Sequence, residues 1–107
     1  MTDFPPEHDW KTMRALHPLV LDRYCTRVLL EITTAVTDTA RSPHERYLAI
    51  HDLMKRRNRE MANAFDDMRR SRALEHVFYI RRLGLFTEDE YARFTGAMRD
   101  EVAKIER

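Results

Sequence analysis

The sequence predicts an all-α fold built from three main helices. Only two glycines and four prolines occur among 107 residues, fewer than the turns of a β protein would require. The chain is 43% apolar and 35% charged, a balance typical of amphipathic helices in a globular protein. Apolar residues also recur at spacings of three and four along most of the chain. The length suits one core, so we expect a single α-helical domain over residues 18–107.

Residues 1–17 are expected to form an N-terminal arm. Pro5-Pro6 favours an extended backbone near its start. A short helical turn over residues 9–16 is the alternative. The arm should end at Pro18, because the residue before a proline is disfavoured in the helical conformation.

The first helix is predicted over residues 18–39. Pro18 suits a first helical position, and one apolar stripe follows it: Leu21, Cys25, Val28, Ile32 and Ala35 or Val36. Residues 31–39 are rich in β-branched side chains, which are also typical of a strand. Because no second strand is available to pair with such a segment, a helix is the better interpretation.

The second helix is predicted over residues 43–83. Ser42 and Glu45 have the spacing of a capping box, with Pro43 at the first helical position. No further proline or glycine follows until Gly84, so one helix of about 60 Å is expected. The alternative is a break near residues 70–73, with the last third of the chain folded back into a monomeric four-helix bundle.

The third helix is predicted over residues 88–106, after the turn at Gly84. Thr87 and Glu90 again have the spacing of a capping box, and Phe86 can pack on Tyr91 across the cap. The segment "LEHVFYIRRLGLFTEDEYARF" also resembles the short helical hairpins of SHOCT-type domains, which share a glycine turn followed by Thr-Glu-x-Glu. The resemblance implies a helical hairpin and no particular function.

The length of the second helix predicts a homodimer. A compact domain of this size has a radius of gyration of about 13 Å, so its own chain cannot cover a rod of about 60 Å. The first and third helices should form antiparallel hairpins with it, and a second copy should complete the bundle. Met54, Met61 and Met68 could instead line a groove that binds a helix of another protein, which is the less favoured interpretation. The expected interface consists of Met54, Met61, Phe65, Met68, Val77, Phe78 and Tyr79.

The basic residues of the second helix suggest an alternative function. The net charge is only +1, but residues 55–82 hold nine basic and four acidic residues. Acids lie three or four residues from many of the arginines, which favours a solvated helix with local ion pairs. The alternative is nucleic-acid binding through phosphate contacts. The candidates for those contacts are Arg56, Arg59, Arg69, Arg70 and Arg72.

No motif in the sequence predicts catalysis, a cofactor or a metal site. His44 and His51 are two helical turns apart, about 10 Å, too far to share one ion. Cys25 is the only cysteine and lies in an apolar stripe, which fits a reducing compartment and a cytoplasmic location. No segment has the pattern of an export signal or a membrane span. The expected function is therefore a small, non-enzymatic protein-interaction or regulatory module.

Overall fold

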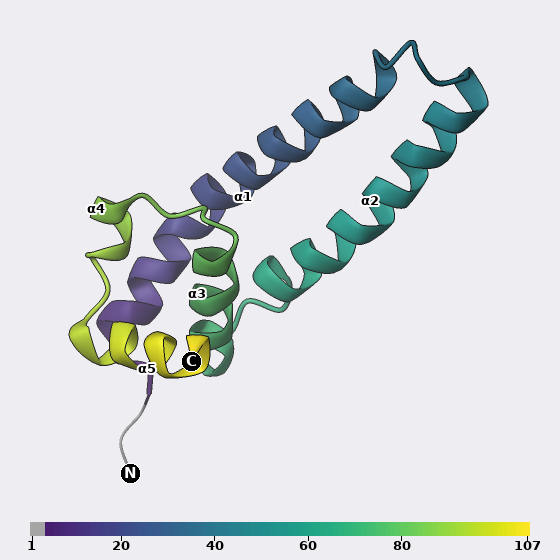
Figure 1. Cartoon of the computed structure of the whole chain (residues 1–107). Coiled ribbons are helices and arrows are strands. Elements are labelled where there is room, and N and C mark those ends of the chain that lie inside the picture. Colours follow the sequence, from purple (N-terminus) through teal and green to yellow (C-terminus); the bar gives the residue numbers. More distant parts are fainter. Residues whose placement is uncertain (1–3) are drawn as a thin grey trace.

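The computed structural model describes residues 4–107, and these residues form helices and turns without a strand (Figure 1). The all-α prediction is confirmed for this part of the chain. The elements, in chain order, are α1 (Glu7–Val36), α2 (Pro43–Phe65), the 3₁₀ turn η1 (Arg70–Arg72), α3 (Ala73–Arg82), α4 (Glu88–Tyr91) and α5 (Gly96–Glu106).

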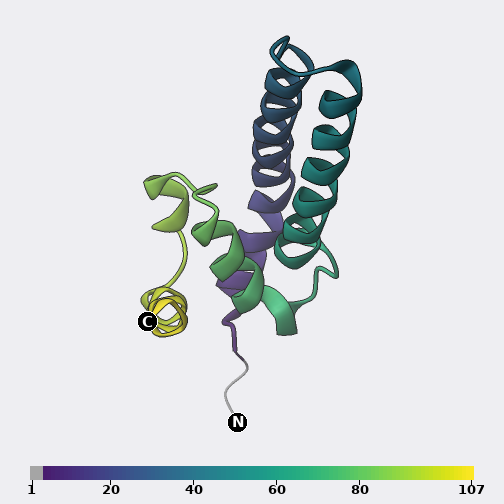
Figure 2. The same ribbon diagram turned by 45° about the vertical axis from the view of Figure 1, so that its right-hand side comes forward.

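The molecule consists of a base and a long helical hairpin that extends from it (Figures 1 and 2). We call residues 4–28 together with residues 64–107 the base, and residues 29–63 the distal hairpin. The molecule measures 58 × 26 × 24 Å with a radius of gyration of 16.7 Å, well above the value of about 13 Å for a compact domain. The hydrophobic core lies in the base: Met13, Leu16, Val20, Tyr24, Val28, Ala64, Phe65, Val77, Ile80, Leu85, Phe94, Met98 and Val102.

α1 begins eleven residues earlier than the sequence predicts, at Glu7 instead of Pro18. Residues 7–17 therefore belong to this helix and not to an arm, and residues 1–3 of that arm lie outside the described part of the chain. Met13 and Leu16 are buried on the same face as Val20, and this burial offsets the cost of a proline inside the helix. Pro18 itself is exposed, so its ring disturbs no core contact.

The β-branched end of α1 is helical, as predicted, although the helix ends at Val36 rather than at residue 39. The hydroxyls of Thr33 and Thr34 donate to the carbonyls of Leu29 and Leu30, one turn earlier, at 2.9 and 3.1 Å. These bonds hold the threonine side chains along the helix. The guanidinium of Arg46 donates to the Val36 carbonyl at 2.6 Å and so caps the end of α1.

The prediction of one continuous helix over residues 43–83 is wrong. α2 ends at Phe65, Asp66 is extended, and Asp67 takes a left-handed backbone conformation with φ of 58°. The carbonyls freed at this end are satisfied by two histidines. His17 Nε2 donates to the Phe65 carbonyl at 3.0 Å, and His76 Nε2 donates to the Asp66 carbonyl at 2.8 Å.

Burial of α3 explains why the chain turns back after α2. Ala73, Val77 and Ile80 are all completely buried in the base, where α3 packs against α1, α2 and α5. A continuous rod would carry these three side chains away from α1 and leave them in water, at a cost of about 1.5–3 kcal/mol for each large side chain. The chain therefore resembles the predicted alternative of a fold-back more closely, with the break before residues 70–73.

The predicted helix over residues 88–106 is also interrupted, because α4 ends at Tyr91 and α5 begins only at Gly96. Thr95 caps α5 through its side chain. The buried carboxylate of Asp9 in α1 accepts from the Thr95 backbone amide at 2.7 Å and from its hydroxyl at 2.6 Å. This tie fixes the start of α5 against the start of α1.

Both capping boxes predicted from the sequence are confirmed. Ser42 and Glu45 bond reciprocally at the start of α2, and Thr87 and Glu90 do so at the start of α4. The rings of Phe86 and Tyr91 lie 6.0 Å apart across the second cap, as the sequence predicts.

Candidate functional site on the helical hairpin

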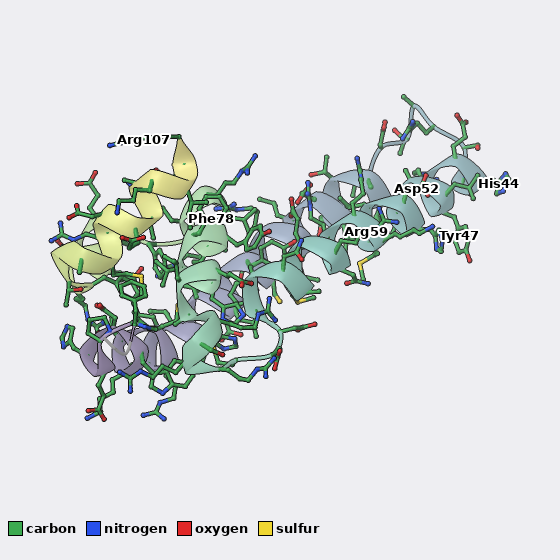
Figure 3. All side chains as sticks on the ribbon, turned by 90° about the horizontal axis from the view of Figure 1, so that it is seen from below. His44, Tyr47, Asp52, Arg59, Phe78 and Arg107 are labelled. Atoms are coloured by element: carbon green, nitrogen blue, oxygen red, sulfur yellow. The ribbon has the colours of Figure 1, made fainter. Side chains whose placement is uncertain are left out.

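One side of the hairpin carries an apolar surface whose side chains are exposed or only partly buried. We call it the apolar face, and its residues are Cys25, Leu29, Ile32 and Val36 on α1 with Tyr47, Ile50, Met54 and Met61 on α2. The exposed fraction is 62% for Leu29, 69% for Tyr47 and 40% for Met54. Figure 3 shows Tyr47 projecting from the far end of α2, away from the base.

The residues of the apolar face repeat with the period of a helical seam. Their spacings are four, three and four on α1, and three, four and seven on α2. Such spacing places them in a row along each helix, as in coiled coils and four-helix bundles. The middle of the face is hollowed into a groove of about 190 Å³, lined mostly by apolar side chains from both helices. Each helix of the hairpin therefore presents a row of apolar side chains on the same side.

The apolar face carries little net charge. Arg57 borders the groove, but its guanidinium is bound to Glu31 at 2.9 Å and to Glu60 at 3.1 Å. The hydrogen bond from Arg57 holds the pKa of the Glu31 carboxyl below its ordinary value. Beside the apolar rows the helical positions hold neutral side chains, such as Thr33 and Asn58. Arg57, the one cation of the described chain that borders the groove, is therefore neutralised by carboxylates of its own chain.

Only two of the seven residues predicted for the interface, Met54 and Met61, lie on the apolar face. Phe65 and Val77 are buried in the core of the same chain, with exposed fractions of 4% and 0%. The other three, Met68, Phe78 and Tyr79, are partly buried against that core, as Met61 also is. Phe78 is seen on α3 within the base in Figure 3.

A second surface lies on the outward side of α2. We call it the basic hollow. It has a volume of about 520 Å³ and is lined by Arg41 from the turn before α2 and by Ala49, Asp52, Lys55, Arg56 and Arg59. Asp52 and Arg59 lie along this helix in Figure 3. Four cations and one carboxylate give the hollow a local charge of +3.

Of the five arginines predicted to bind phosphate, only Arg56 and Arg59 line the basic hollow. The other three lie after the end of α2 in the sequence, and their guanidinium groups bind other residues of the base. Arg69 pairs with Asp67, and Arg72 pairs with Glu75 at 3.0 Å. Arg70 donates twice to the Pro5 carbonyl, at 3.0 and 2.9 Å. Sequence reasoning missed Arg41 and assigned no role to Lys55, because the pairing of each cation depends on the fold.

The buried polar side chains of the base serve structural bonds. Asp9 binds the cap of α5, and His76 donates from Nε2 to the Asp66 carbonyl. Burial lowers the pKa of His76, so its ring is neutral in the folded state near pH 7. Within residues 4–107 no group of three His, Cys, Asp or Glu side chains is arranged to hold a metal ion. In the same residues no helix has the length and apolar character needed to cross a membrane.

No family model matches the chain, and no curated protein or solved structure is significantly similar to it. Function must therefore be inferred from the geometry of the hairpin itself.

Proposed function

We propose that this chain is a small, non-enzymatic interaction module that acts as a homodimer, in which the apolar faces of two copies pair into a four-helix bundle. The distal hairpin carries this proposal, because it buries only one large apolar side chain, Leu53. Four of the nine exposed large hydrophobic residues of the described chain also lie on its apolar face: Leu29, Val36, Tyr47 and Met54. Apolar surface gathered in this way on a projecting element is typical of an interaction site.

The size of the apolar face supports a second copy as the partner. From Tyr47 to Met61 the face is about 21 Å long, and two adjacent helices are about 20 Å wide. The projection is therefore about 420 Å², and the accessible area is larger because side chains protrude. A stable interface buries about 800 Å² on each partner. Two hairpins packed face to face would also reach the four helices that usually enclose a core.

The lack of charge on this face also favours self-association. A face that carries neither a net charge nor an unpaired ion is complementary to another face of the same kind, and a twofold pair brings together two identical ones. Cys25, the only cysteine in the sequence, fits this arrangement as a small apolar side chain. We propose a cytoplasmic location on the same ground.

Charge substitution at adjacent residues tests the dimer. Leu29 lies on the apolar face, whereas Leu30 points about 100° away from it and is at least as exposed, with fractions of 62% and 68%. Leu29→Glu should dissociate the dimer, because it places two buried carboxylates in an apolar interface. Leu30→Glu should leave the dimer intact. Both variants should stay folded by far-UV circular dichroism, since neither side chain is part of the core.

Molar mass in solution is the measurement, by light scattering after size-exclusion chromatography. We expect the wild type and Leu30→Glu at twice the chain mass of 12.9 kDa, and Leu29→Glu at 12.9 kDa. A wild-type chain that is monomeric at tens of micromolar would show that no second copy covers the face. Equal behaviour of the two variants would show that the interface lies elsewhere.

A further inference from the structure

The basic hollow collects side chains from two separate parts of the distal hairpin. Lys55, Arg56 and Arg59 come from the outward side of α2, and Arg41 reaches the same hollow from the turn that joins α1 to α2. The capping box at Ser42 fixes where that turn meets the helix. The position of Arg41 is thus set by the same bonds that start α2.

None of these four cations forms an ion pair or a side-chain hydrogen bond with any residue between 4 and 107. This distinguishes them from most arginines of the protein. Arg57, on the same helix, is paired with Glu31, and Arg46 caps the end of α1. Four like charges held around one hollow repel each other, and a multivalent anion bound between them would relieve that repulsion.

We propose that the basic hollow binds an oligophosphate, the group of linked phosphates that nucleoside triphosphates and inorganic polyphosphate share. Guanidinium groups form paired hydrogen bonds with phosphate oxygens, and three of the four cations are arginines. The volume of about 520 Å³ lies within the range of small-molecule sites.

The carboxylate in the hollow favours a compact anion over an extended nucleic-acid backbone. A backbone that runs along a surface is bound by cations spread in a row or stripe. Here the row of cations on α2 is interrupted by a carboxylate, Asp52, and a fourth cation, Arg41, comes from the turn before the helix. Asp52 would repel a uniform row of phosphates, but it can accept a hydrogen bond from a hydroxyl or amine of a ligand whose phosphates lie on the arginines.

Calorimetric titration of the full chain with inorganic tripolyphosphate and with ATP tests the proposal, at about 20 mM and about 200 mM salt. We expect one ligand per chain, with weaker binding at the higher salt. The double variant Arg56→Ala/Arg59→Ala should lose at least about tenfold in affinity, because it removes two of four charge-assisted contacts. Circular dichroism should show that it stays folded, since both side chains are exposed.

The matched control is Arg82→Ala/Arg93→Ala. It removes the same charge from two exposed arginines that also lack ion pairs but lie outside the hollow. This control should bind as the wild type does. Equal losses in the two double variants would mean that only the net charge matters, and absence of binding at low salt would equally overturn the proposal.

The two ligands and a nucleic-acid competitor separate the possible sources of the phosphates. Equal affinities for tripolyphosphate and ATP would support recognition of the phosphate chain alone, and tighter binding of ATP would support a nucleoside triphosphate. Binding of ATP without binding of tripolyphosphate would contradict the proposal. So would a single-stranded oligonucleotide that binds and that tripolyphosphate cannot displace, because the hollow would then recognise an extended backbone.

Discussion

Replacing Glu90 with glutamine isolates the ion pair that ties the middle of α1 to the short helix α4. Both carboxylate oxygens of Glu90 accept from Arg23, at 2.8 and 3.1 Å. One of them also accepts from the Thr87 backbone amide at 2.8 Å, as part of the capping box. The Glu90 side chain is only 13% exposed. Glutamine keeps the shape and an oxygen for the cap, but it removes the charge that Arg23 binds.

The expected loss of stability follows from the protonation of Glu90. The bonds from Arg23, with the cap, lower the pKa of the Glu90 carboxyl from 4.5 to about 2. Such a shift corresponds to about 3 kcal/mol of stability at neutral pH. Glutamine retains the cap bond, and Arg23 is 34% exposed and regains water when its partner is lost. We therefore expect Glu90→Gln to reduce the free energy of unfolding by about 2 kcal/mol near pH 7.

The same ion pair predicts how this difference depends on pH. The folded pKa lies below the unfolded one, so the contribution of Glu90 is complete above pH 4.5 and is lost as the pH falls toward about 2. Urea unfolding followed by circular dichroism should therefore show a gap between wild type and variant near neutral pH that closes in acid. Glu88→Gln, an exposed acid in the same turn, is the control and should change stability by less than about 0.5 kcal/mol. A gap that persists at low pH, or that is absent at pH 7, would refute the reasoning.

Two further substitutions test the base. Val77→Ala should lower the unfolding free energy by about 2 kcal/mol in urea, because Val77 is completely buried within its own chain. If it instead altered only the dimer dissociation constant, Val77 would lie between subunits and the fold-back of α3 would be wrong. His76, whose folded pKa is lowered by burial, should make the protein less stable as the pH falls below 6.5, the ordinary value. His76→Gln, which can still donate to Asp66, should flatten the slope of stability between about pH 7.5 and 5.5, and an unchanged slope would contradict this.

The features that sequence reasoning located correctly are those set by neighbouring residues. Both capping boxes and the packing of Phe86 on Tyr91 depend on side chains within five positions of each other. The hydroxyls of Thr33 and Thr34 likewise bond to carbonyls one turn away within the helix. In each case the residues that decide the structure lie within a few positions of it.

The break after Phe65 could not be predicted from the residues near it in the sequence. The usual signals, glycine and proline, are absent, and the residue with a positive φ is Asp67. Aspartate tolerates this conformation better than most residues, so Asp66-Asp67 is a weak local signal. What decides the break is the burial of α3 among residues that precede it by about sixty positions. In the sequence, apolar residues keep their helical spacing across this break, and that spacing favoured one continuous helix.

The predicted helix start at Pro18 was wrong for the opposite reason, because the local preference of proline for a first helical position was given too much weight. Proline is common at the first position of a helix, but it is also tolerated inside one when tertiary packing outweighs the lost hydrogen bond. Met13, Leu16 and Val20 supply that packing on the buried face of α1. The same spacing was visible in the sequence, and it could have extended the predicted helix toward its actual start.

The two surfaces of the distal hairpin lie on different sides of α2, and this separates the two proposals physically. At about 100° per residue, Arg56 and Arg59 point about 160° and 140° away from Met54 on the apolar face. Two copies that pair through their apolar faces would therefore leave both basic hollows open to solvent, on the outside of the bundle. Oligophosphate binding should then be independent of oligomeric state. The monomeric Leu29→Glu chain should bind tripolyphosphate as tightly as the dimer does, because the dimer interface contributes none of the four cations.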